Sequence, residues 1–179
     1  MKNIFDDGFY KSKQLKKIGF KKIGKNVKIS KNCLIIGVKN ISISDNVRID
    51  SFTSIIAKEG YLKIGNNVHV GGHGHILCSG GVVINSNCTI SQGVKIYSQS
   101  DDYSEDSKHG LFVRNKRLNY QKGKINIGEF TIIGSGSVIL PKVDIVNNCS
   151  IGALSLVNKN IIKKGIYAGI PCKKIKKIL

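Results

Sequence analysis

In groups of three, β-branched aliphatic residues recur six positions apart in this chain, and this period constrains the fold more than any other feature. Eighteen such positions form six triplets. They are Ile23, Ile29 and Ile35; Ile43, Ile49 and Ile55; Ile64, Val70 and Ile76; Ile84, Ile90 and Ile96; Ile127, Ile133 and Ile139; and Ile145, Ile151 and Val157. A period of six fits neither the 3.6-residue repeat of a helix nor a single alternating strand, although it is a multiple of two. It predicts a repeat solenoid.

Each six-residue unit is long enough for one short strand and a bend, so three units close a triangular coil. The fourth residue after each aliphatic position is mostly small or apolar and is expected to face the same interior. These residues are Val27, Cys33, Val47, Thr53, Val68, Gly74, Cys88, Val94, Thr131, Ser137, Val143, Cys149 and Ser155. We call this second inward position the small interior slot. Between the aliphatic position and the small interior slot lie polar and glycine residues such as Gly65, Asn66 and Asn67, which suit tight corners. The expected fold is all-β, a prism of three parallel sheets.

One insertion interrupts the aliphatic ladder, the series of eighteen inward residues given above. The triplets start 20, 21, 20, 43 and 18 residues apart, so one coil carries a large insertion over residues 97–124. A loop of this length in a solenoid is usually functional or disordered. The sequence therefore divides into an N-terminal basic cap (1–22), the β-helix with its inserted loop (23–166) and a C-terminal basic tail (167–179).

Short basic segments flank the prism. Residues 11–18 are expected to form a helix that Gly19 stops, and the segment Ala168-Gly169-Ile170-Pro171 turns the chain into a basic tail that caps the other end. The expectation is a solenoid with short terminal helices and one long loop.

The 179 residues, 41% of them hydrophobic, contain no run of about 18 apolar residues and no signal peptide pattern, so we expect one domain in the cytoplasm. The five cysteines agree with this location. Their number is odd, and three of them (Cys33, Cys88 and Cys149) occupy the small interior slot, which favours buried thiols over disulfides or zinc ligands.

The net charge of +18 comes mainly from lysines at the corners and both ends. Because no aromatic residues alternate with the lysines and no nucleic-acid-binding motif is present, a nucleic acid partner is not expected. A solvated basic surface is one interpretation. An anionic ligand, such as a nucleotide-bearing cofactor or an acidic sugar, or the inner membrane face, is the other.

Two C-terminal stretches resemble a known family. IGSGSVILPKVDIVNNCSIGALSLVNKNI (133–161) and YAGIPCKKIKK (167–177) are similar to the last coils and the closing signature of the hexapeptide-repeat acyltransferases, in the branch of galactoside, maltose and streptogramin acetyltransferases. IYSQSDDYSE (96–105) and GFKKIGKNVKIS (19–30) are similar to acetyltransferases of bacterial surface-polysaccharide gene clusters. The resemblance covers nearly the whole chain. It implies a left-handed coil, which the period of six does not determine.

The resemblance further implies transfer of an acetyl group from acetyl-CoA to a hydroxyl or amino group of a sugar, with the hydroxyl preferred, in a homotrimer whose active sites lie between subunits. No metal is expected. The family's cofactor positions correspond to Ser135, Ala153, Asn158, Lys159, Lys173 and Lys176. Small side chains would let a thin pantetheine arm approach the backbone, and lysines would meet the phosphates. Ser135 and Ala153 are equally typical of any tight coil.

Direct acyl transfer needs a base for the acceptor's proton. In the galactoside and maltose enzymes this base is a histidine of the long loop, at the position of Asp101, so the usual base is missing here. Positions 69, 71 and 73 correspond to the acceptor pocket, which makes His69 the first candidate for the base, His73 the second and Gly71 a substrate contact. His69 lies in NVHV, similar to the NVHI of the polysaccharide branch, and should face outward between Val68 and Val70. His75 and His109 are weaker candidates.

Other loop residues add candidates. Asp101 and Asp102 would orient an imidazole or stabilise its charge, or cap the loop. Tyr97 and Tyr103 are candidates for stacking against a sugar and equally for anchoring the loop. The segment 114–117 (RNKR) suits an acidic acceptor such as a nucleotide-linked sugar.

Two alternatives remain open. The same prism hosts zinc hydratases, and His69, His73 and His75 offer ligands for such a site. The missing loop histidine also fits a catalytically inactive scaffold.

Overall fold

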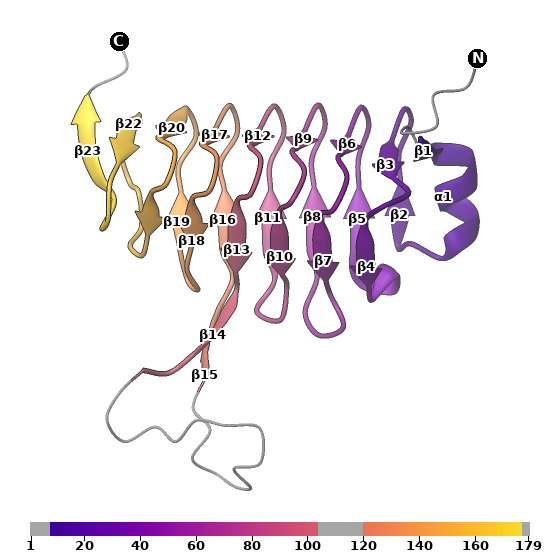
Figure 1. Ribbon diagram of the computed structural model, residues 1–179, viewed down its shortest axis with the longest axis horizontal. Coiled ribbons are helices and arrows are strands. Elements are labelled where there is room, and N and C mark those ends of the chain that lie inside the picture. Colours follow the sequence, from indigo (N-terminus) through magenta and orange to yellow (C-terminus); the bar gives the residue numbers. More distant parts are fainter. Residues whose placement is uncertain (1–7, 104–119, 177–179) are drawn as a thin grey trace, which may run out of the picture.

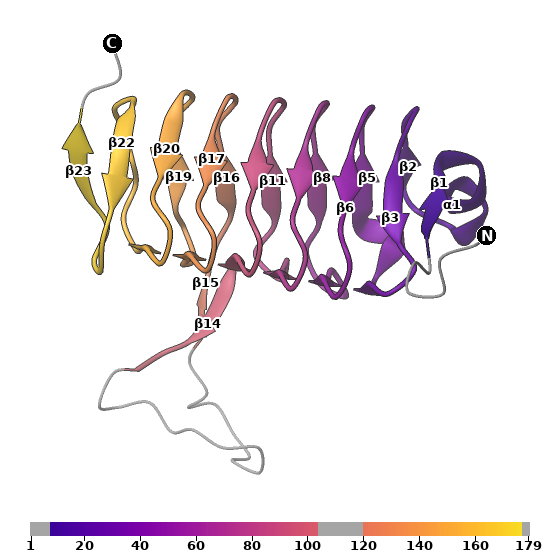
Figure 2. The ribbon, with the colours of Figure 1, turned by 45° about the horizontal axis from the view of Figure 1, so that its top comes forward.

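The computed structural model describes residues 8–103 and 120–176, which form a three-sided prism of parallel β-strands stacked along one long axis (Figure 1). His109 and the segment 114–117 lie outside the described residues. Each coil contributes one strand to each of three sheets, which we name B, A and C in the order in which the chain passes through them (Figure 2).

Each sheet takes one strand from nearly every coil. Sheet A contains β1 (Phe9–Lys11), β3 (Lys28–Ser30), β6 (Arg48–Ile49), β9 (His69–Val70), β12 (Thr89–Ile90), β17 (Ile132–Ile133), β20 (Cys149–Ile151), β22 (Gly165–Ala168) and β23 (Lys173–Lys176). Sheet B contains β2 (Lys22–Ile23), β5 (Ile41–Ile43), β8 (Leu62–Ile64), β11 (Val82–Ile84), β16 (Ile125–Ile127) and β19 (Asp144–Ile145). Sheet C contains β4 (Leu34–Ile36), β7 (Ser54–Ile56), β10 (His75–Leu77), β13 (Lys95–Tyr97), β18 (Val138–Ile139) and β21 (Leu156–Val157). A short 3-10 helix, η1 (Val38–Asn40), precedes β5.

The aliphatic ladder forms the core, as predicted. In sheet B, for example, Ile43 pairs with Ile64, Ile64 with Ile84 and Ile84 with Ile127 in parallel register. Seventeen of the eighteen ladder residues are buried, and the exception, Ile35, is half-buried because β4 is the edge strand of its sheet. Each buried isoleucine stabilises the prism by roughly 1.5–3 kcal/mol relative to exposure.

The small interior slot is also confirmed. Its residues are buried, except that Cys33 is half-buried. All five cysteines are free thiols, and burial raises the pKa of the Cys78 thiol to about 12. The cysteines therefore act as small apolar side chains in this core.

All three corners place residues in the left-handed backbone region, and at the corner between sheets C and B these are Gly37, Gly60, Gly81 and Lys142. At the corner between sheets B and A, Asn26, Asn46, Asn67 and Asn87 form a ladder of side-chain hydrogen bonds of 2.9–3.1 Å. We call the corner between sheets A and C the A–C corner. Its left-handed residues are Phe52, His73, Gly93, Gly136 and Leu154.

The two ends of the prism are closed differently. At the N-terminal end, α1 (Ser12–Ile18) ends at Gly19, whose φ is 97°, and its buried Leu15 covers the first coil. At the C-terminal end the prediction of a helix is wrong, because the basic tail forms β23, which pairs antiparallel with β22. The tail gains ladder hydrogen bonds on the open sheet edge, and it covers that edge.

An arm leaves the prism after β13 (Figure 1). The base of the long loop is a two-stranded antiparallel ribbon of β14 (Gln99–Asp101) and β15 (Tyr120–Lys122). Ser98, fully buried, fixes its origin: its Oγ donates to the carbonyl of Leu77 at 2.7 Å and accepts the N–H of Gly80 at 2.9 Å. Lys122 Nζ lies 3.2 Å from Glu59 Oε2.

The described residues include no helix with the length and apolar character that crossing a bilayer requires.

Candidate active site

A cavity of about 700 Å³ lies where the arm meets sheet C. Its arm side consists of Gln99, Ser100, Asp101, Tyr103 and Gln121, and its prism side of Leu77, Tyr97, Val138, Leu140 and Pro141. The structure thus brings together three predicted site residues, Tyr97, Asp101 and Tyr103, around one hollow with an apolar floor and a carboxylate at its rim. Asp102 follows directly and is half-buried. Such a hollow is the usual form of a small-molecule site.

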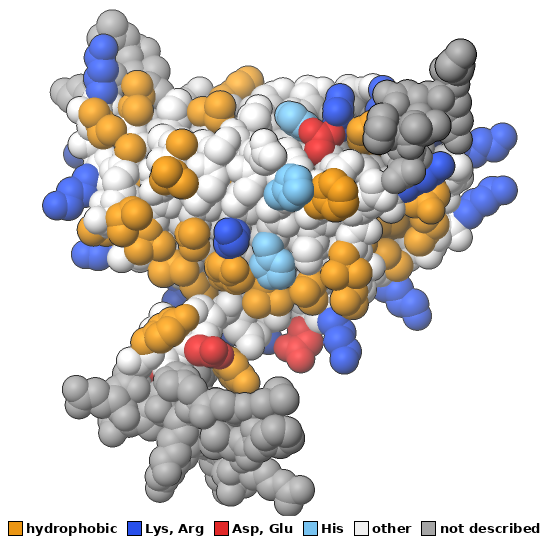
Figure 3. All heavy atoms as spheres, viewed as in Figure 1, with side chains coloured by type: hydrophobic (Ala, Val, Ile, Leu, Met, Phe, Trp, Pro, Cys, Tyr) orange, Lys and Arg blue, Asp and Glu red, His pale blue; other side chains and the backbone are white. Residues whose placement is uncertain are grey.

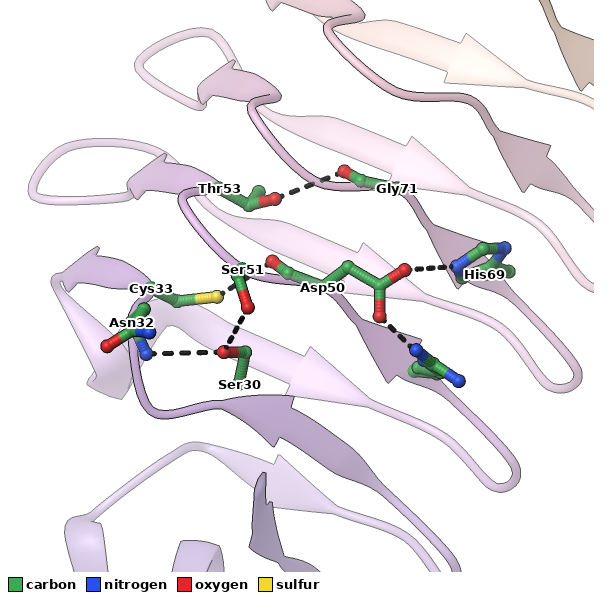
Figure 4. Close-up of polar contacts among 9 residues, drawn as sticks. Ser30, Asn32, Cys33, Asp50, Ser51, Thr53, His69 and Gly71 are labelled. Carbon is green, nitrogen blue, oxygen red and sulfur yellow. Dashed lines mark hydrogen bonds and ion pairs between the residues drawn. The ribbon is translucent and has the colours of Figure 1, made fainter. Parts of the chain in front are cut away.

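His69 does not line this cavity. It lies on β9 with an exposed side chain, as its alternation with Val68 and Val70 predicted. Its Nε2 is 2.8 Å from Asp50 Oδ2, and the other Asp50 oxygen accepts from Arg48 Nε at 2.6 Å (Figure 4). Burial alone would raise the pKa of the Asp50 carboxyl, but the hydrogen bonds from His69 and Arg48 lower it below its usual value. His69 therefore has a carboxylate partner, but the partner is Asp50.

His73 and His75 are nearer in sequence than His69 to Leu77, which lines the cavity. His73 is exposed on the A–C corner and stacks on Phe52, with ring centroids 5.0 Å apart and planes at 28°. His75, on β10, contacts Tyr97 at a centroid distance of 5.4 Å. Burial and the nearby Lys95 lower the pKa of His75 below its usual value. Figure 3 shows the histidines gathered on one face of the prism, beside exposed hydrophobic side chains and one acidic group.

Gly71 has a packing role. It is buried, and a Cβ there would lie 2.7 Å from the Gln92 amide nitrogen of the next coil. Its carbonyl accepts from Thr53 Oγ1 at 3.1 Å (Figure 4). Contact of Gly71 with a substrate remains a prediction.

The predicted cofactor residues gather at the C-terminal half of the prism. Ser135 and Ala153 are exposed at equivalent places of consecutive coils, where Leu154 N–H donates to the Ser135 carbonyl at 2.9 Å. Asn158 and Lys159 are exposed after β21, and Lys173 and Lys176 are exposed on β23. Ser135 and Ala153 thus lie at the A–C corner, whereas the lysines lie beyond sheet C and on sheet A, and contact of these residues with CoA remains a prediction.

Sequence reasoning missed Asp50 and Phe52. The sheet register could have located Asp50, because Arg48, two residues earlier, pairs with His69 in the parallel ladder. Phe52 puts an aromatic ring at a corner position that is glycine in two later coils.

Among the described residues, no three His, Cys, Asp or Glu side chains converge in an arrangement that could hold a metal ion. His69, His73 and His75 contact Asp50, Phe52 and Tyr97 respectively. The zinc alternative remains a prediction for metal analysis to test.

The chain is similar to proteins of known activity over most of its length. It is 40% identical over 162 residues, 90% of this chain and 84% of the relative, to the dTDP-4-amino-4,6-dideoxy-D-glucose acyltransferase of Escherichia coli. It is 31% identical over 119 residues, 66% of this chain and 58% of the relative, to galactoside O-acetyltransferase of Escherichia coli K12. No family model matches the chain.

Solved structures of acyltransferases are also similar to this chain. The N-acyltransferase AntD from Bacillus cereus, in complex with dTDP and 3-hydroxybutyryl-CoA, superposes with a TM-score of 0.90 at 35% identity, covering 96% of this chain and 90% of AntD. A variant of AntD is a complex with dTDP-4-amino-4,6-dideoxyglucose and coenzyme A, with a TM-score of 0.90 at 34% identity over 96% of this chain and 91% of AntD. The chain is a left-handed parallel β-helix and belongs to the hexapeptide-repeat acyltransferases.

Proposed function

We propose that this chain transfers an acyl group from an acyl-CoA to the amino group of a nucleotide-linked aminosugar. The observation that carries the proposal is the 40% identity to an aminosugar acyltransferase over 84% of its length. AntD, whose structures hold dTDP-sugar and CoA ligands, supports the same donor and acceptor classes. The preference for a hydroxyl acceptor, taken from the galactoside branch, is replaced by a preference for an amine.

Asp101 in place of the loop histidine fits this choice of acceptor. A hydroxyl must lose its proton while it attacks, so it needs a good base. A free amine attacks the thioester carbonyl with its own lone pair, and the nitrogen then carries a positive charge that makes its proton acidic. A carboxylate is a sufficient base for that proton. We therefore assign proton removal to Asp101, which lines the cavity, in place of His69, which lies outside its lining.

The balanced reaction needs no other reactant. The amine nitrogen forms a bond to the thioester carbon, the carbon–sulfur bond breaks, and the sulfur leaves as the thiol of CoA after it gains the proton. The products are an amide and free CoA.

The outward face of sheet C supports self-association, and we include the homotrimer in the proposal. Its strands place Ile36, Ile56, Leu77 and Tyr97 in one outward row. Ile36 is exposed and the others are half-buried in the isolated chain. Because the cavity is lined by residues of this same face, a second copy bound there would contribute side chains to the cavity and enclose it.

The basic surface suits both ligands. Between Gly8 and Ser44 the chain has ten lysines and no Asp or Glu, so the N-terminal end of the prism is uniformly positive. Acyl-CoA and nucleotide sugars are polyanions, and such a field raises their local concentration at low ionic strength.

The test combines binding, turnover and metal content. Acetyl-CoA and longer acyl-CoAs are expected to raise the melting temperature, because a ligand of the folded state stabilises it, whereas zinc is not. Thiol release should require both an acyl-CoA and a nucleotide-linked aminosugar. Stoichiometric zinc in purified protein, together with no thiol release, would favour the hydratase, and absence of both zinc and turnover would favour the inactive scaffold.

A further inference from the structure

Phe52 and His73 form an exposed aromatic pair on the A–C corner. The Phe52 side chain is 59% exposed, and its ring is stacked on the imidazole of His73, one coil further along, with centroids 5.0 Å apart. Neither ring belongs to the core of buried residues. Two aromatic groups thus lie on the surface, close to the cavity face, with their contact to each other already made.

Their backbone conformation makes the choice of residue unusual. Phe52 has φ 61° and His73 has φ 58°, both in the left-handed region, which costs energy for a bulky side chain. Gly93 and Gly136 occupy the same corner of later coils and Leu154 that of the last coil, while asparagines fill every left-handed position of the neighbouring corner except that of Phe130. Phe52 gains no turn stability at this position, and more than half of its side chain stays exposed although it contacts His73. A ligand that covers its ring would supply the missing interaction.

We propose that the Phe52–His73 pair is the platform on which the base of the nucleotide-linked acceptor stacks. The inference rests on the proposed function, because it concerns the nucleotide part of that acceptor. Exposed aromatic rings bind bases through their faces and tolerate different bases. Phe52 and His73 each cover one face of the other, so a base would stack on an outer face of the pair. Asp50, two residues before Phe52, and His69, four residues before His73, are hydrogen-bonded to each other, and Asp50 is also bonded to Arg48, so polar groups lie near the pair along the chain.

The position on the corner selects the acceptor over the cofactor, although both carry a base. The predicted CoA residues Ser135 and Ala153 lie on coils toward the C-terminal end, whereas Phe52 and His73 lie toward the N-terminal end. Gly93 and Gly136 separate the two regions without side chains, and Asp101 leaves sheet C on the coil of Gly93. The donor and the acceptor would then approach the cavity from opposite ends of one corner.

The decisive variant is Phe52→Asn, because asparagine tolerates the left-handed backbone and keeps the turn. Phe130→Asn is the matched control: Phe130 is also 59% exposed and left-handed, with φ 55°, but lies on the corner between sheets B and A. The dissociation constants of dTDP and of CoA are measured by calorimetry for the wild type, both variants, Phe52→Tyr and Phe52→Leu. Thermal unfolding checks that each variant is folded.

Phe52→Asn is expected to weaken dTDP binding roughly ten- to hundredfold, Phe52→Leu to weaken it less, and Phe52→Tyr to retain it. CoA affinity should be unchanged in all of them, and Phe130→Asn should match the wild type. In turnover, the Phe52→Asn defect should appear in KM for the nucleotide sugar, with kcat retained at saturation.

Unchanged dTDP affinity in folded Phe52→Asn would overturn the platform, as would an equal loss of dTDP and CoA affinity or an equal loss in Phe130→Asn. Failure of the proposed function is a separate result: wild-type protein would release no thiol with any nucleotide-linked aminosugar. Wild type that does not bind dTDP overturns the platform too.

Discussion

His69 Nε2 lies 2.8 Å from Asp50 Oδ2 across two adjacent coils of sheet A, and the same carboxylate accepts from Arg48 Nε at 2.6 Å. The two contacts hold one acidic group between two basic side chains on the surface. This arrangement explains the lowered pKa of Asp50, and it gives His69 a structural partner away from the cavity.

The first prediction concerns the pH dependence of stability. Because the folded-state pKa of Asp50 is lowered, its stabilisation is present above the unfolded-state pKa of about 3.9 and is lost as pH falls through the folded-state pKa. Asp50→Asn should therefore destabilise the protein at pH 7, by less than about 1 kcal/mol because the group is partly solvated. Urea unfolding should show this difference vanishing in strong acid. A difference that is the same at both pH values would contradict the pairing.

The second prediction separates the two candidate bases. Asp101→Asn is expected to lower kcat about a hundredfold or more while acyl-CoA affinity is retained. Asp144→Asn, on the opposite sheet B, is the matched control and should leave turnover unchanged. His69→Gln should have a much smaller effect than Asp101→Asn. Full activity in Asp101→Asn with loss in His69→Gln or His73→Gln would return the role to an imidazole.

The third prediction concerns the anchor of the arm. Ser98→Ala removes two hydrogen bonds from a fully buried position and leaves the Gly80 N–H and the Leu77 carbonyl without this partner. We expect a loss of about 1–3 kcal/mol in unfolding free energy. Because Ser98 lies three residues before Asp101, the turnover of the folded variant should fall as well. Wild-type stability would show that the arm is held by other contacts.

The fourth prediction concerns the predicted CoA residues on the A–C corner. Ala153→Leu adds bulk on an exposed corner position without disturbing the core, so it should raise the dissociation constant of acyl-CoA and leave that of dTDP unchanged. Ser135→Ala, which adds no bulk at the equivalent place of the preceding coil, is the control. Equal CoA affinity in wild type and Ala153→Leu, measured by calorimetry, would place the pantetheine arm elsewhere.

The sequence predicted the prism because each coil repeats the same local choice. An inward isoleucine, a small interior residue and a glycine or asparagine corner agree at every turn, so pattern, turn chemistry and packing point to one fold. The long loop was predicted for the same reason, since the ladder breaks only between Ile96 and Ile127. The C-terminal strand was not, because KKIK has no strand pattern of its own and is set by the open edge of β22.

The site was less predictable than the fold. The tyrosines Tyr97 and Tyr103 were proposed apart from Asp101, and all three line one cavity because the arm leaves the prism directly after β13 of sheet C. The partner of His69 depends on contacts between coils about twenty residues apart, which the period locates only once the sheet register is known. Phe52 and His73 are likewise about one coil apart in the sequence. Their rings stack because both residues occupy the same left-handed corner position of adjacent coils.

The most direct test of the central claim is the mass spectrum of the product formed from an acyl-CoA and dTDP-4-amino-4,6-dideoxyglucose, before and after treatment with hydroxylamine. Transfer to the amine should give a nucleotide sugar heavier by one acyl group, in an amount equal to the CoA released, and resistant to hydroxylamine because the new bond is an amide. An acylated product that hydroxylamine cleaves would reveal an ester and a hydroxyl acceptor, and it would contradict the account.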